Sequence, residues 1–139
     1  MSNFVLDASV TLAWLIDGSI DPYAMRVRQL LMDGNTALVP SLWRFEIANG
    51  FVVAERRRIL TADHSKDILH RFEAVLGQAI RVVSDSLPIG RVLATARNSG
   101  LTAYDAAYLL LAQEEQVPIA TLDRRLADTA KQAGVPLVR

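Results

Sequence analysis

The sequence has no cysteine, no net charge and no long apolar run, and each absence narrows the possible functions. Without cysteine, disulfides, thiolate nucleophiles and cysteine-based zinc sites are excluded, which is compatible with a reducing cytoplasm. A formal net charge of +0 means that any binding of nucleic acid needs a local patch. The longest apolar run, from Ala106 to Ala112, is too short to span a bilayer. Because the N-terminus also lacks the basic region of a signal peptide, we expect a cytoplasmic protein with no membrane segment.

What the sequence does contain is typical of one globular domain. Its 139 residues are 51% hydrophobic and 22% charged, which is enough apolar material for a core and argues against disorder. It contains no internal repeat, linker or low-complexity segment. We therefore expect a single domain over residues 1–139.

Segments with strand patterns and helix patterns alternate along the chain. Short apolar runs predict strands at residues 4–6, 36–39, 80–83, 119–121 and 136–138. Apolar residues at helical spacing predict helices at about residues 8–16, 22–32, 42–58, 62–76, 87–98, 102–115 and 124–133, with Ser41, Thr61 and Thr102 as N-caps. This alternation predicts an α/β fold of three layers, α/β/α, with a central, mostly parallel sheet of about five strands.

Four acidic residues stand where predicted strands end or helices begin. Asp7 and Asp123 each follow a strand directly, and Glu46 lies near the start of the helix after the second strand. Asp105 lies in the first turn of its helix. Because right-handed crossovers return each parallel strand in the same direction, these places lie on one edge of the sheet. We therefore predict that the four carboxylates meet in one cleft at that edge, where α/β sheets bind their ligands.

Each of these acids also has a simpler explanation. Asp7 and Asp123 suit helix N-caps. Asp105 follows Thr102 at the spacing of a capping box, and Glu46 can be a solvated acid on a helix. Against these explanations, the surrounding residues are apolar or small, and the helix that holds Asp105 is apolar on nearly all sides. A buried acid needs a partner, and the nearby arginines are too few to neutralise all four.

A divalent cation resolves the mutual repulsion of clustered carboxylates. Mg²⁺ and Mn²⁺ take oxygen ligands and keep several waters, and they can activate water for attack on a phosphodiester. Ser9 and Thr121, each two residues from an acid, can hydrogen-bond a ligand carboxylate or a metal-bound water. Bonding to the local backbone is the alternative for both hydroxyls. Asn49, one helical turn from Glu46, can join the same cleft.

The order and surroundings of the four acids resemble those of the PIN domain, and most closely the VapC toxins of bacterial and archaeal toxin–antitoxin pairs. The segments that carry the resemblance are Val5-Leu6-Asp7-Ala8-Ser9, Ser41-Leu42-Trp43-Arg44-Phe45-Glu46-Ile47-Ala48-Asn49, Leu101-Thr102-Ala103-Tyr104-Asp105-Ala106-Ala107-Tyr108 and Ala120-Thr121-Leu122-Asp123. Any one segment is a weak signal, whereas four in this order are a strong one. Together they cover essentially the whole chain.

The resemblance implies an activity, a cofactor and partners. It implies a Mg²⁺- or Mn²⁺-dependent endoribonuclease that acts as a toxin, forms a homodimer and is inhibited by a VapB-type antitoxin. The family's acidic positions, which would be catalytic and metal-binding, fall on Asp7, Glu46, Asp105 and Asp123. The family's polar position beside the last acid falls on Thr121.

Two other classes of function compete with this hypothesis. A phosphotransfer or phosphatase domain would use Asp7 as a nucleophile, with a second acid beside it and a lysine late in the fold. Here Ala8 and Ser9 follow Asp7, and Lys131, the only late lysine, is a poor candidate. A catalytically silent PIN fold that only binds protein or RNA is the remaining alternative, and the intact acids argue against it. Residues 56–58, all arginine, are predicted to be a solvated helix end rather than a phosphate site.

Overall fold

The computed structural model describes residues 2–17, 21–83 and 87–139, in which strands and helices alternate. In chain order the elements are β1 (Asn3–Leu6), α1 (Ala8–Leu15), α2 (Pro22–Met32), β2 (Thr36–Pro40), α3 (Leu42–Arg56), α4 (Ala62–Leu76), the 3-10 turn η1 (Gly77–Ala79), β3 (Ile80–Val83), α5 (Ile89–Ser99), α6 (Ala103–Glu115), β4 (Ile119–Ala120) and α7 (Arg124–Gln132). None of the helices in these residues is long and apolar enough to cross a membrane. The α/β fold class predicted from the sequence is confirmed.

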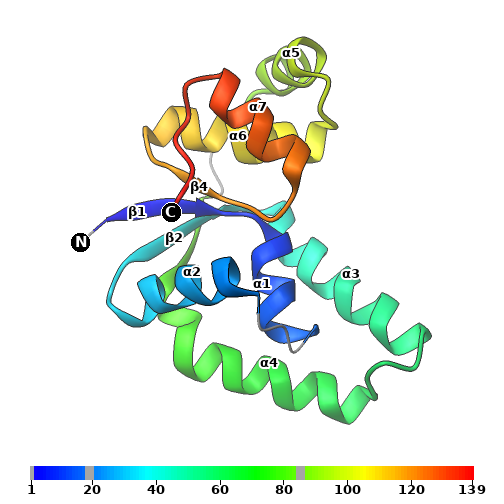
Figure 1. Cartoon of the computed structure of the whole chain (residues 1–139). Coiled ribbons are helices and arrows are strands. Elements are labelled where there is room, and N and C mark those ends of the chain that lie inside the picture. Colours follow the sequence, from blue (N-terminus) through cyan, green and yellow to red (C-terminus); the bar gives the residue numbers. More distant parts are fainter. Residues whose placement is uncertain (1, 18–20, 84–86) are drawn as a thin grey trace.

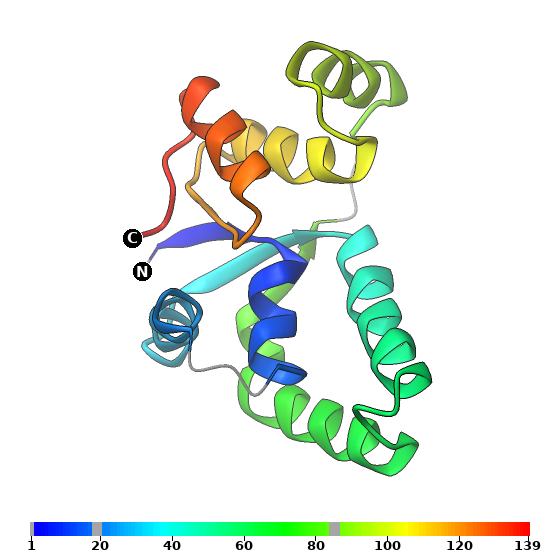
Figure 2. The same cartoon turned by 45° about the vertical axis from the view of Figure 1, so that its right-hand side comes forward.

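A parallel sheet forms the middle layer. Within the described residues it has four strands in the order β3-β2-β1-β4. Val5 of β1 pairs with Leu38 of β2 on one side and with Ile119 of β4 on the other. Helices α1 to α4 lie on one side of the sheet and α5 to α7 on the other (Figure 1), and the turned view in Figure 2 shows the same three layers. All carboxyl ends of the strands therefore share one edge.

The prediction of a fifth strand at residues 136–138 is wrong. Only Leu137 forms a bridge, and its partner is Ile119 of β4. Two backbone hydrogen bonds hold this bridge, from the Ile119 amide to the Pro136 carbonyl and from the Val138 amide to the Ile119 carbonyl, both 2.9 Å. The physical reason is length, because β4 has only two residues and leaves no room for a longer ladder.

Helix α6 is the central helix of the fold, as its apolar sequence predicts. Seven consecutive residues, from Ala106 to Ala112, are buried. The helix packs against β1 and β2, whose apolar residues are themselves buried. On the opposite side of the sheet, α3 approaches α1 closely, since a Cβ added at Gly50 would stand 2.5 Å from the Leu12 side chain. These two contacts fix α1, α3 and α6 around the carboxyl end of β1.

Most helix ends follow the capping chemistry expected from the sequence. The hydroxyls of Thr61 and Thr102 each accept the backbone N–H three residues later at 3.1 Å. Ser41 occupies the N-cap position of α3, but its side chain forms no capping hydrogen bond. Helix α3 ends at Arg56, two residues before the predicted end, because Arg58 adopts a left-handed conformation with φ of 59°.

Candidate functional site

One pocket gathers all four acids that the sequence singled out. It has a volume of about 450 Å³, and Asn49 and Ser9 line it together with Asp7, Glu46, Asp105 and Asp123. The acids come from the end of β1, from α3, from the first turn of α6 and from the start of α7. Among the described residues, the lining contains no lysine, arginine or histidine. We call this cavity the acidic pocket.

Asp7 is held by hydroxyl groups rather than by a helix end. It occupies the N-cap position of α1, yet its side chain forms no capping hydrogen bond. The carboxylate is buried, with 5% of the residue exposed, and its Oδ2 accepts Ser9 Oγ at 2.6 Å and Thr121 Oγ1 at 2.7 Å. Both hydroxyls also accept backbone amides, of Leu122 and Asp123 respectively. The capping explanation is therefore wrong for Asp7, and the two hydroxyls make the carboxylate bonds expected of them.

Asp123 and Asp105 combine a helix start with a place in the pocket. Asp123 Oδ1 accepts the Leu126 amide at 3.0 Å, so the capping explanation is right for this residue. Asp105 stands in the first turn of α6, and its backbone amide donates to the hydroxyl of the N-cap residue Thr102. Both side chains nevertheless line the acidic pocket and are partly exposed. An acid can therefore stand at a helix start and line the acidic pocket at the same time.

Glu46 has a partner that sequence reasoning missed. The hydroxyl of Tyr108 donates to Glu46 Oε1 at 2.5 Å. Tyr108 is fully buried on α6, one turn after Asp105, and its hydroxyl is a polar atom within an otherwise apolar buried run. That isolated hydroxyl was the available signal, because a buried hydroxyl requires a hydrogen-bond partner.

The carboxylates of the acidic pocket interact electrostatically. Burial raises the pKa of Asp7 above its ordinary value of 3.8, and the charge of Asp123 raises it further, against its hydroxyl hydrogen bonds, which lower it. Burial also raises the pKa of Glu46 and of Asp105, and the charge of Asp7 adds to both. Burial and the neighbouring acids both raise these pKa values, because each disfavours the ionised form of a carboxyl group.

The acids line one pocket, but the described residues contain no group of three or more His, Asp or Glu side chains arranged to hold a metal ion as it stands. Two of the acids are engaged elsewhere, Asp123 by the Leu126 amide and Glu46 by Tyr108. Without a cation, the mutual repulsion of the carboxylates also keeps them apart. Metal ligation by these four acids therefore stays a prediction, as does the role of Asn49, which lines the pocket.

Replacing Tyr108 by Phe tests the buried hydrogen bond. Phenylalanine keeps the ring in the core but removes the donor, so the free energy of unfolding should fall by about 1 kcal/mol. Urea unfolding at neutral pH measures the change. Tyr104→Phe is the matched control, because Tyr104 lies on the same helix and is 66% exposed, so its hydroxyl is solvated. Equal losses in both variants would mean that the bond to Glu46 contributes nothing specific.

The fold and the acidic pocket define a class of α/β proteins with carboxylates gathered at one sheet edge, and comparison with known proteins identifies the family. The PIN domain model matches residues 4–132, so this chain belongs to the PIN domain family. The chain is also 30% identical over 126 residues to ribonuclease VapC3 of Pyrobaculum aerophilum, covering 91% of this chain and 93% of that protein. The resemblance found in the sequence is confirmed.

Solved structures share the fold. PAE2754 of Pyrobaculum aerophilum matches with a TM-score of 0.66 at 21% identity, over 92% of this chain and 84% of that one. FitAcB of Neisseria gonorrhoeae matches with a TM-score of 0.64 at 15% identity, over 100% of this chain and 97% of that one. At these identities the similarity establishes the three-layer fold and nothing further.

Proposed function

We propose that this protein is a Mg²⁺- or Mn²⁺-dependent endoribonuclease that hydrolyses RNA phosphodiester bonds. The observation that carries the proposal is the acidic pocket, which four carboxylates line with no basic side chain among the described lining residues. The homology to ribonuclease VapC3 supports the choice of RNA as substrate. Helix capping does not explain Glu46, which lies within α3, or Asp7, which is buried.

The donor set of the acidic pocket fits a hard divalent cation. Carboxylate oxygens are the ligands that Mg²⁺ and Mn²⁺ prefer. Burial first, and neighbouring acids second, raise the pKa values of Asp7, Glu46 and Asp105, and a bound cation would oppose both effects. Asp7, Glu46, Asp105 and Asp123 would hold the ion. When bound, such an ion makes water a better nucleophile and stabilises negative charge on a phosphodiester.

The residues around the acids orient them for this task. The hydroxyls of Ser9 and Thr121 occupy Oδ2 of Asp7 and restrict the rotation of its carboxylate. Tyr108 does the same for Glu46, and burial together with the charge of Glu46 raises the pKa of the Tyr108 hydroxyl far above its ordinary value. The phenol proton therefore stays on Tyr108 near neutral pH, where the hydroxyl donates to Glu46.

An RNA cleavage assay separates this proposal from a catalytically silent PIN fold. The purified chain should cleave RNA with Mn²⁺ or Mg²⁺ and should stop when EDTA removes the metal. A silent module would bind RNA or protein without cleaving under either condition. The absence of any metal-dependent cleavage by a protein that is free of bound partner would favour the silent module.

We further propose that the protein acts as the toxin of a toxin–antitoxin pair and works as a homodimer with a VapB-type antitoxin as its inhibitor. Large apolar side chains are exposed at Phe45 and Tyr104 on the rim of the acidic pocket and at Ile89 on α5, which suits a protein interface. Light scattering should give the mass of a dimer. Expression alone should arrest growth, and co-expression with the product of a small neighbouring gene should relieve it.

A further inference from the structure

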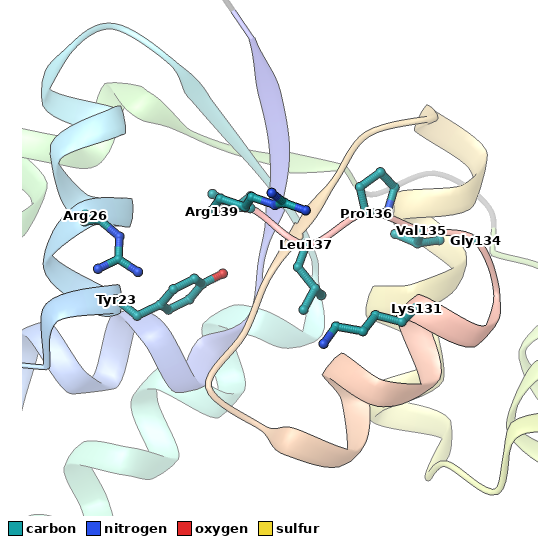
Figure 3. Close-up of a pocket in the computed structure, with 9 residues that line it drawn as sticks. Tyr23, Arg26, Lys131, Gly134, Val135, Pro136, Leu137 and Arg139 are labelled. Carbon is teal, nitrogen blue, oxygen red and sulfur yellow. The ribbon is translucent and has the colours of Figure 1, made fainter.

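A second pocket, distinct from the acidic one, lies between α2, α7 and the C-terminal segment. It has a volume of about 860 Å³, and its lining includes Tyr23, Arg26, Lys131 and Arg139 but no acidic residue among those described. Figure 3 shows Tyr23 pointing from α2 toward the C-terminal segment, the Arg26 guanidinium beside the Tyr23 ring, and Lys131 extending from α7 on the opposite side. We call this cavity the cationic pocket.

The basic side chains of the cationic pocket are exposed. In the part of the chain that the structure describes, neither Arg26 nor Lys131 forms a salt bridge, whereas Arg91 pairs with Glu114 on the molecule's surface. The guanidinium of Arg26 lies 5.6 Å from the centre of the Tyr23 ring, a cation–π contact that orients it. Arg26 on α2 and Lys131 on α7 present two exposed positive charges to this cavity.

Thr121 lies near residues of both pockets. Burial raises the pKa of the Tyr23 hydroxyl, and the Thr121 backbone lowers it, so Tyr23, which lines the cationic pocket, lies near Thr121. The side chain of the same Thr121 donates to Asp7 in the acidic pocket. A ligand that occupies both pockets would therefore pass over the short connection between β4 and α7.

We propose that the cationic pocket binds backbone phosphates of the RNA segment that flanks the bond presented to the acids. The proposal rests on the ribonuclease function proposed above. Four carboxylates repel a polyanion, so a nuclease with no net charge needs a local cationic surface next to them. Arginine and lysine are the usual phosphate contacts, and arginine can contact two phosphate oxygens at once. An acidic peptide is the competing ligand.

The test measures RNA binding without cleavage. Fluorescence anisotropy with a labelled single-stranded RNA in EDTA gives the affinity over a series of salt concentrations. Each phosphate contact contributes about 0.7 to the slope of log affinity against log salt for single strands. We expect the slope to become shallower by about 0.7 in Lys131→Gln and by about 1.4 in Arg26→Gln/Lys131→Gln. Lys66→Gln/Arg97→Gln is the matched control, because it removes the same charge from exposed positions on α4 and α5.

The outcomes separate this proposal from the proposed function. If the wild-type chain cleaves RNA with Mn²⁺ but the double variant keeps the wild-type affinity and slope, the pocket is not an RNA site and the ribonuclease assignment stands. A slope that falls equally in the control pair would also overturn the proposal. If the double variant loses affinity for an oligoglutamate peptide and not for RNA, the pocket binds an acidic protein segment instead. If the wild type neither binds nor cleaves RNA, both proposals fail.

Discussion

Asp105→Asn should lower the rate of Mn²⁺-dependent RNA cleavage by about a thousandfold or more. The substitution preserves size and keeps the amide that Thr102 caps, but it removes one negative charge from the acidic pocket. A hard cation loses an anionic ligand, and a loss of about 4 kcal/mol in transition-state stabilisation corresponds to about three orders of magnitude in rate. Single-turnover cleavage of a labelled RNA by purified protein measures the effect.

The control for this experiment is Asp128→Asn. Asp128 is an exposed acid on α7 that does not line the acidic pocket, so its removal changes the net charge by the same amount. Its cleavage rate should match the wild type within about twofold, because an exposed charge far from the chemistry contributes little. Undiminished cleavage by Asp105→Asn would refute the assignment of the acidic pocket as the catalytic site.

Excess Mn²⁺ should raise the thermal stability of the wild type strongly and that of Asp105→Asn weakly. A ligand that binds only the folded state stabilises it by RT ln(1 + [L]/Kd), or about 2.7 kcal/mol at a hundredfold excess over Kd. For a chain of this size that corresponds to a rise of about 10 °C in Tm. Calorimetry of both proteins, each with EDTA and with Mn²⁺, measures the four midpoints.

In EDTA Asp105→Asn should be more stable than the wild type, and the difference in stability should depend on pH. Burial and neighbouring acids raise the pKa of Asp105 and of Asp7 in the folded state. A group with a raised folded pKa contributes stability that is fully present below its unfolded pKa and is lost as the pH rises through the folded pKa. The wild type should therefore lose stability relative to Asp105→Asn from about pH 4 upward, and the gap should level off once both states are ionised.

The outcome also tests the simpler explanation of Asp105. If the residue only belonged to a helix start, Asn would replace it with little change, and Mn²⁺ would have no effect on either protein. Asp128→Asn should respond to Mn²⁺ as the wild type does. Four equal midpoints would mean that the acids do not form a shared metal site, even though they line one pocket.

The sequence was sufficient for features that depend on neighbours along the chain. The strand that ends before Asp7 and the apolar run of α6 were predicted at nearly the right residues, since period and local burial determine them. Thr61 and Thr102 cap their helices as predicted, because the hydroxyl and the amide that it accepts are three residues apart. The common edge of the four acids followed from the handedness of parallel crossovers.

Local pattern failed where the partner of a segment decided its structure. Residues 136–138 have an apolar strand pattern, but β4 is too short to pair with more than one of them. Ser41 has the chemistry of an N-cap, yet its backbone adopts a helical conformation and its side chain caps nothing. The sequence of a segment determines its local conformational preference. It does not determine the length of the strand beside that segment or the backbone angles at which the chain enters a helix.

By itself the sequence determined the α/β alternation, the family and the four acids with the edge on which they meet. Only the tertiary structure decided which groups hold those acids. Thr121 lies 114 positions from Asp7, and Tyr108 lies 62 positions from Glu46, so no local spacing could pair them. Arg26 and Lys131 likewise line one pocket only because α2 and α7 flank the same C-terminal segment. Hydrogen bonds and pockets depend on distance in space, and packing of the whole chain sets that distance.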